Sequence, residues 1–151
     1  TLHRQVVDLN QLVAETLETL QYTPVALDRQ LEFWPSRPPV TVTADPDKLK
    51  QVLINLVTNA CGAASDGDRV HISVSSRGSD RSCLQVHNGG CPIHPEQLSK
   101  LTEPYYTTKA TGTGLGLAIV QRIIDAHAGA LKIESAATAG TTVTVTLPSQ
   151  R

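Results

Sequence analysis

The 151-residue sequence has few aromatic side chains and almost no excess of either charge. Aromatic residues make up 3% of the chain, and 13 basic side chains stand against 14 acidic ones, for a formal net charge of −1. Proteins that bind nucleic acid usually combine a basic surface with aromatic rings on which bases stack. The composition therefore argues against a nucleic-acid partner.

Long apolar runs and paired cysteines are also missing. No stretch approaches the ~20 apolar residues that cross a bilayer, and no signal peptide is visible. Cys61, Cys83 and Cys91 are odd in number and lack the CxxC spacing of zinc or redox motifs. We therefore expect a cytosolic domain with small buried or bystander cysteines, which is compatible with a membrane-anchored parent protein.

The remaining composition suits one globular domain. With 40% hydrophobic residues, the chain can bury a core of useful size. We expect residues 1–151 to form a single domain, in which residues 1–8 are a junction from a preceding segment. Because the sequence starts at Thr1 rather than methionine, we expect it to be a piece of a longer protein.

The apolar periodicity predicts interleaved helices and strands. Asp8 or Asn10 can cap the first helix, and Asp45 can cap the second, with Pro46 in its first turn. The elements predict an α/β (α+β) two-layer sandwich, with one mixed, mostly antiparallel sheet covered on one face by about three helices. The predicted helices lie at 8–20, 46–64, 95–101 and 113–128, and the predicted strands at 30–34, 40–43, 70–76, 83–86, 131–133 and 143–147.

A glycine-rich run at 112–117, Gly-Thr-Gly-Leu-Gly-Leu, precedes the last predicted helix. Glycines let backbone N–H groups approach an anion closely, and a helix N-terminus carries partial positive charge that favours phosphate. No Gly-Lys-Ser or Gly-Lys-Thr closes the run and no buried strand precedes it, so it fits neither a P-loop nor a Rossmann motif. Taken alone, the run is also compatible with an ordinary loop.

The second predicted helix carries a stripe of side-chain amides. Gln51, Asn55 and Asn59 follow one another at intervals of four residues, opposite an apolar face. Asparagine is a poorer helix former than Lys or Glu, so its repetition calls for a function, although chance placement is the alternative. An amide oxygen can ligate Mg²⁺ and an amide NH₂ can donate to phosphate. The stripe predicts that metal and phosphates share this face.

These segments, in this order, resemble the ATP-binding catalytic domain of two-component sensor histidine kinases, in the GHKL superfamily. Residues 51–60 resemble the N box, 88–92 the G1 box, 103–109 the F box and 112–117 the G2 box. Residues 140–142 are similar to the final glycine box near the adenine. The resemblance covers nearly the whole chain and identifies it as a GHKL-type domain.

The resemblance implies ATP and Mg²⁺ as cofactors. Asn59 is then the principal Mg²⁺ ligand, Asn55 lies close to both phosphate and metal, and Lys109 reaches a terminal phosphate, so that Asn55 and Lys109 are the catalytic side chains. The segment 102–111 is expected to be a lid over the nucleotide, in which Tyr105 or Tyr106 can equally be a core aromatic. The other implied nucleotide contacts are Asn88, Gly90, Tyr106, Thr108, Gly112, Thr113, Gly114, Leu115, Gly116, Leu117, Thr141 and Thr142.

The G1 segment departs from the family pattern. Asn88 stands where the family has an Asp that accepts from the adenine amino group, and Pro92 replaces the last glycine. An Asn carbonyl can still accept that bond, but a charge-assisted hydrogen bond is roughly twice as strong as a neutral one. Pro92 also removes a backbone donor and stiffens the loop. We therefore expect weakened ATP binding.

The residue at position 55 separates two chemistries. Relatives that hydrolyse ATP carry a Glu four residues before the metal-binding Asn, whereas this chain has Asn55, which cannot act as a general base for water. The resemblance therefore implies transfer to a histidine on a separate dimerisation and phosphotransfer domain of the same parent, and from there to a response regulator. The five histidines of this chain lack the phosphoacceptor box and are expected to be surface or structural. The isolated domain should be monomeric, and its parent a homodimer.

Two other functions fit the same residues. An anti-sigma-type serine/threonine protein kinase of this superfamily uses the same boxes without a helical hairpin. A degenerate nucleotide-binding module that serves only for docking would account for the altered residues 88–92.

Overall fold

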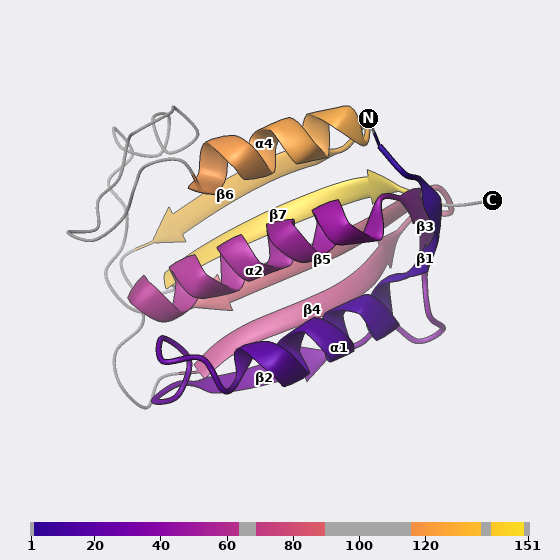
Figure 1. Ribbon diagram of the computed structural model, residues 1–151. Coiled ribbons are helices and arrows are strands. Elements are labelled where there is room, and N and C mark those ends of the chain that lie inside the picture. Colours follow the sequence, from indigo (N-terminus) through magenta and orange to yellow (C-terminus); the bar gives the residue numbers. More distant parts are fainter. Residues whose placement is uncertain (1, 64–68, 90–115, 137–139, 150–151) are drawn as a thin grey trace.

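The computed structural model describes residues 2–63, 69–89, 116–136 and 140–149. Within these ranges, three helices cover one face of a five-stranded sheet, as Figure 1 shows. The expected two-layer fold with a mixed, mostly antiparallel sheet is confirmed. No helix in the described ranges is long and apolar enough to cross a bilayer. The predicted helix at 95–101 and the predicted lid at 102–111 lie outside these ranges.

The sheet places its strands in an order that differs from their order in the chain. From one edge to the other it runs β2 (Gln30–Trp34), β4 (Arg69–Arg77), β5 (Arg81–Asn88), β7 (Gly140–Pro148) and β6 (Ala130–Ala136). The expected hairpins β4–β5 and β6–β7 are antiparallel. β2 is parallel to β4, because strand β3 (Thr41–Ala44) and a helix connect them in a crossover.

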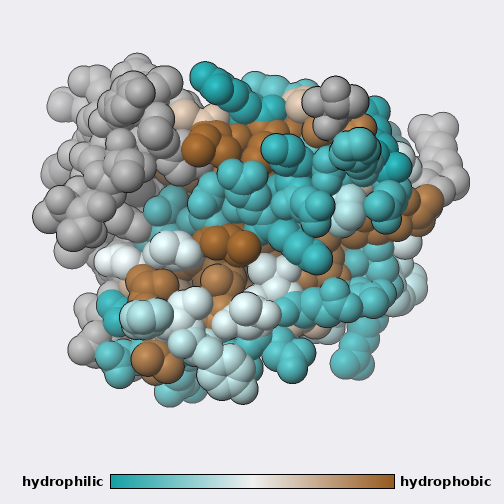
Figure 2. All heavy atoms as spheres, viewed as in Figure 1, coloured by the Kyte–Doolittle hydropathy of each residue, from teal (hydrophilic) through white to brown (hydrophobic). Residues whose placement is uncertain are grey.

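The two N-terminal helices begin at the predicted caps. Helix α1 (Leu9–Leu20) starts after Asp8, whose side chain accepts a hydrogen bond from the Gln11 N–H at 3.2 Å. Helix α2 (Pro46–Ala63) starts after Asp45. Hydrophilic residues cover most of the helical side in Figure 2, and apolar atoms show mainly between the helices. The largest fully buried side chains, which form the core between the layers, are Leu9, Val13, Val42, Val52, Leu53, Leu56, Val57, Val70, Ile72, Val86, Val120 and Ile124.

The segment expected to be a junction contains a strand. Strand β1 (Gln5–Asp8) pairs antiparallel with β3, so that Val7 lies opposite Val42 and is buried. The pairing joins segments more than 30 residues apart, and β1 on its own is too short and too polar to show a strand pattern. The leading segment is therefore fixed to the fold by a second, two-stranded sheet.

Helix α4 (Gly116–Ala126) ends two residues earlier than predicted. Ala128 has a φ of 58°, and the Gly129 N–H donates to the Ile124 carbonyl at 3.0 Å, the bond of a Schellman termination. A Cβ at Gly129 would lie 2.5 Å from the Thr146 carbonyl oxygen. The chain therefore leaves the helix at a position where only glycine allows it to pass close to β7.

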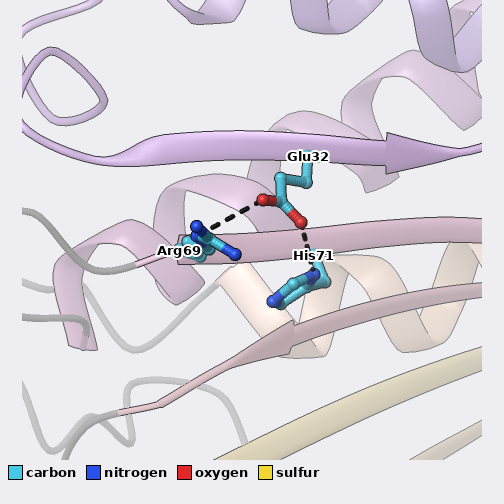
Figure 3. Close-up of polar contacts among 3 residues, drawn as sticks. All are labelled: Glu32, Arg69 and His71. Atoms are coloured by element: carbon cyan, nitrogen blue, oxygen red, sulfur yellow. Dashed lines mark ion pairs between the residues drawn. The ribbon is translucent and has the colours of Figure 1, made fainter.

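The face of the sheet away from the helices is polar. Alternate residues of each strand point to this outer face, and one row of directly paired positions crosses all five strands. Figure 3 shows Glu32 beside Arg69 and His71, with Glu32 Oε1 at 3.3 Å from Arg69 Nε and Oε2 at 3.1 Å from His71 Nδ1. We call this set the outer-face row; its members are Glu32, His71, His87, Thr142 and Glu134.

The end of α4 gives a test of backbone strain. An L-residue held at positive φ strains the folded state by about 1–2 kcal/mol. Glycine avoids this strain but lowers stability by about 0.4–1 kcal/mol, because it gives the unfolded chain more conformational freedom. Ala128→Gly should therefore raise the free energy of unfolding by about 0.5–1 kcal/mol in urea denaturation. The same change at exposed Ala14, inside α1, should lower it by about 1 kcal/mol. A loss of stability in the Ala128 variant would contradict this account.

The outer-face row gives a test with pH. Burial, and to a lesser degree the charge of His71, hold the pKa of His87 below its usual value of 6.5. As the pH falls through this usual pKa, the unfolded chain binds a proton at His87 more readily than the folded chain does. The free energy of unfolding should therefore fall as the pH is lowered. Urea midpoints measured from neutral to mildly acidic pH should show this fall, and His87→Gln should reduce it. His3→Gln, which leaves the row intact, is the control, and equal slopes for His87→Gln and the unaltered chain would contradict the prediction.

Candidate functional site

Helix α2 presents the predicted amide stripe away from the core. Asn55 and Asn59 are half-buried and lie one turn apart, while Gln51 is exposed. Their spacing on a regular helix places both amides on the same face. The predicted apolar face is confirmed, since these residues are buried: Leu49, Val52, Leu53, Leu56, Val57 and Ala60.

The N-terminal end of α2 is held by Asp45. Its carboxylate accepts hydrogen bonds from the N–H groups of Asp47 at 3.1 Å and Lys48 at 3.3 Å, and from the N–H of His3 at 3.1 Å. The His3 bond foremost, with the two cap bonds, holds the pKa of this carboxyl below its usual value. The carboxylate is therefore charged at neutral pH, where it suits the positive end of the helix.

A buried histidine joins α2 to α4. His127 Nε2 accepts the Asp45 N–H at 3.1 Å, and its Nδ1 lies 2.7 Å from the Ile123 carbonyl oxygen, to which it donates. Sequence reasoning missed this contact, because the two residues are 82 positions apart and neither carries a local motif for it. The bond fixes the C-terminal end of α4 against the N-terminal end of α2.

Asn88 and Thr141 form the part of the site that belongs to the sheet. They are directly paired across β5 and β7, face the helices, and are 4% and 7% exposed. The Asn88 side-chain NH₂ donates to the Gly89 carbonyl, which leaves the amide oxygen as the group that can accept from a ligand. Both polar side chains are therefore buried between the sheet and the helices, at the C-terminal end of β5 and the N-terminal end of β7.

Gly140 fixes how β7 begins. Its φ is 77°, and a Cβ at this position would overlap the Asn88 carbonyl oxygen and lie 2.9 Å from the carbonyl carbon. Only glycine can therefore bring β7 this close to the end of β5. The contact holds Thr141 directly beside Asn88.

Helix α4 begins at Gly116, and its first N–H groups have no partner within the helix itself. Leu117 packs its half-buried side chain against the core, so its contribution to a ligand is its backbone. The predicted contacts that lie outside the described residues are Gly90, Tyr106, Thr108, Lys109, Gly112, Thr113, Gly114 and Leu115.

Thr142 is oriented away from the other predicted contacts. Its hydroxyl lies 2.7 Å from His87 Nδ1 in the outer-face row, on the opposite side of the sheet from Thr141. The side chain of Thr142 therefore does not join the cluster that faces the helices.

The segments that carry the predicted contacts meet at one end of the sandwich. Figure 1 shows the C-terminal ends of α2 and β5 and the N-terminal ends of β7 and α4 at the same end. Helix α2 brings its partially negative end there and α4 its partially positive end. Such an arrangement can hold a cation beside Asn59 and an anion beside Gly116.

Comparison with known proteins agrees with this geometry. A family described as histidine kinase-, DNA gyrase B-, and HSP90-like ATPase matches residues 44–151. The sensor histidine kinase ZraS of Salmonella typhimurium strain LT2 is 39% identical over 144 residues, which are 95% of this chain and 31% of that protein. The chain thus spans about a third of the length of this curated relative.

Solved structures share the fold. The catalytic domain of histidine kinase ThkA superposes with a TM-score of 0.87 at 31% identity, covering 97% of this chain and 96% of that one. Full-length ShkA in complex with AMPPNP gives a TM-score of 0.86 at 26% identity, over 99% of this chain and 32% of that one. With the matched residues covering more than half of its length, the chain belongs to the histidine kinase-, DNA gyrase B- and HSP90-like ATPase family, as a histidine-kinase-type domain of two-component systems.

Proposed function

We propose that the chain binds Mg-ATP at the end of the sandwich where α2 and α4 meet, and donates the γ-phosphoryl group to a histidine on a separate domain. The observation that carries the proposal is the pairing of Asn55 and Asn59, half-buried and one turn apart, with the N-terminus of α4 at the same end. The helix end attracts phosphate and the amides can hold its counter-ion.

The side chains fit Mg²⁺ as the counter-ion. Mg²⁺ prefers oxygen ligands and keeps several waters, so one amide oxygen beside phosphate oxygens is a sufficient protein contribution. Asn59 would supply that oxygen, and the Asn55 amide NH₂ would donate to a phosphate oxygen one turn earlier. Bound Mg²⁺ would neutralise charge that develops on the phosphate oxygens.

The base of the nucleotide fits the sheet side of the site. The Asn88 amide oxygen can accept from the adenine amino group, and Thr141, directly paired with Asn88, can contribute a second polar contact. Because the Gly140 contact fixes this pair, the adenine end of the site is formed by the described fold itself. Gly90, Tyr106 and Thr108 stay proposed contacts that complete the nucleotide site, whereas Thr142 would contribute only its backbone.

The proposed chemistry follows from the neutral amide at position 55. Asn55 is neutral, so it cannot take a proton from a water molecule, and hydrolysis should be slow. An imidazole nitrogen of the acceptor histidine would attack the γ-phosphorus as the bond to the β–γ bridging oxygen breaks and ADP leaves. Phosphoryl transfer depends mainly on positioning and charge stabilisation, which the α4 N-terminus and Lys109 would supply.

The relatives support this activity and its partners. ZraS is a sensor histidine kinase, and ShkA forms a complex with AMPPNP. Since the chain spans 31% of ZraS, the acceptor histidine would lie in another domain of the same parent. We infer that this parent is a homodimeric protein-histidine kinase with a cytosolic catalytic part, which passes the phosphoryl group on to a response regulator.

The metal role of Asn59 is directly testable. Asn59→Ala should lower affinity for an ATP analogue by about tenfold or more when Mg²⁺ is present, because the metal loses its protein oxygen. Titration calorimetry with a non-hydrolysable analogue, with Mg²⁺ and with EDTA, measures this effect.

Gln51→Ala is the matched control, because Gln51 lies on the same stripe two turns earlier and is exposed. It should bind as the unaltered chain does. If Asn59→Ala kept the full Mg²⁺ dependence, the metal would have to be held elsewhere.

The adenine contact predicts nucleotide selectivity. Asn88→Ala should weaken ATP binding about three- to tenfold, the value of one lost neutral hydrogen bond, and should leave GTP binding nearly unchanged. Gln85→Ala, on the same strand but on the outer face, is the control. If Asn88→Ala left the preference for ATP intact, or if neither nucleotide bound the unaltered chain, a docking module would become the better description.

A further inference from the structure

The outer-face row brings two histidines together on neighbouring strands, away from the candidate nucleotide site. His71 and His87 are directly paired across β4 and β5, with ring centroids 6.2 Å apart and ring planes inclined by 44°. Both residues are half-buried. Neither of them takes part in the nucleotide chemistry, and both lie on the opposite side of the sheet from Asn88 and Thr141.

Each ring already uses its Nδ1 atom. His71 Nδ1 lies 3.1 Å from Glu32 Oε2, and His87 Nδ1 lies 2.7 Å from the Thr142 hydroxyl. A carboxylate only accepts, so Glu32 favours a proton on the His71 Nδ1, and the Thr142 hydroxyl can accept from a protonated His87 Nδ1. In this tautomer each ring has a lone pair on Nε2. This is the arrangement that histidine ligands of metals show, in which the second nitrogen donates to a carboxylate or other acceptor.

The separation of the rings suits one ion between them. Two bonds of about 2.0–2.1 Å from a metal to imidazole nitrogens add up to about 4 Å. With the radii of the two imidazole rings added, the 6.2 Å between the centroids accommodates one ion when the N–metal–N angle is wide. The inclined planes allow both Nε2 atoms to turn toward a shared point, which parallel stacked rings would not.

The surroundings hold the His71 ring in place and balance the charges near the two histidines. The Trp34 ring meets the His71 ring edge-on, at a centroid distance of 5.8 Å and an angle of 84°, which limits rotation of the imidazole. Carboxylates stand at both ends of the row, Glu32 beside His71 and Glu134 beside Thr142. The nearby cations Arg69 and Lys132 each pair with one of these carboxylates, at 3.3 Å and 3.7 Å.

We propose that His71 and His87 bind one divalent transition-metal ion through their Nε2 atoms, with water at the remaining positions. Among the described residues, no group of three or more His, Cys, Asp and Glu side chains is placed to hold a metal, so the protein would contribute two ligands. Imidazole pairs suit zinc and the other borderline ions of the first transition row. Glu32 and Thr142 are then positioning residues, which orient the rings without touching the ion.

The test uses Zn²⁺ and the purified chain without nucleotide or chelator. Titration calorimetry should show a saturable site that His71→Gln or His87→Gln weakens at least tenfold. Glu32→Gln should weaken it about 10- to 100-fold, the range for losing a group that orients a histidine ligand. His3→Gln, which removes a histidine near the N-terminus, should leave the affinity unchanged.

Thermal unfolding separates metal binding from damage to the fold. Zn²⁺ should raise the melting temperature of the unaltered chain and of His3→Gln, and should not raise that of His71→Gln/His87→Gln, while melting temperatures in EDTA report folding alone. Absence of saturable binding at millimolar Zn²⁺ would overturn the proposal. So would an unchanged affinity in the double variant, because the ion would then be held by other residues.

Discussion

The fold depends on one carboxylate that ties three parts of the chain together. Asp45 accepts from the N–H groups of His3, Asp47 and Lys48, and its own N–H donates to His127. The leading segment, the start of α2 and the end of α4 are thus joined at one end of the sandwich. Since α2 is a rigid rod of 18 residues, about 27 Å long, what is fixed at Asp45 determines where Asn59 lies at the other end.

The two ends of the sandwich differ in the side chains that they present. Charged anchoring occurs at the end of the sandwich that carries Asp45, whereas the opposite end presents neutral amides and helix termini. Amide side chains can hold a metal-bound polyanion through their oxygen and NH₂ groups. Unlike a carboxylate, they cannot take a proton from a water molecule. Under the proposed function, such a site would keep the γ-phosphoryl group for a nucleophile from another domain.

Much of the fold could be predicted because its signals are local. The caps at Asp8 and Asp45, the apolar face of α2 and the hairpins come from neighbouring residues, and each is confirmed. Strand β1 and the Asp45–His127 bond were missed, since each joins distant segments through at least one backbone group, which every residue carries. Helix α4 ends early because Ala128 adopts a positive φ, a conformation that an alanine in the sequence does not predict.

The candidate site was predicted from the resemblance to family motifs more than from periodicity, and one of its predicted residues has a different orientation from the rest. Asn55 and Asn59 share one face of α2 and Asn88 is directly paired with Thr141, whereas the orientation of Thr142 toward His87 depends on strand alternation. A strand boundary set one residue differently would reverse that assignment. Sequence patterns alone specify such boundaries least well.

That alternation gives the contact at Gly140 a wider consequence. If β7 slipped by one residue against β5, Thr141 and Thr142 would exchange faces, and every inward side chain of the strand would turn outward. Such a slip would also bring a residue with a Cβ against the Asn88 carbonyl, where the structure has space only for hydrogen. Gly140 thus permits the observed register of β7 against β5 and excludes the register shifted by one residue.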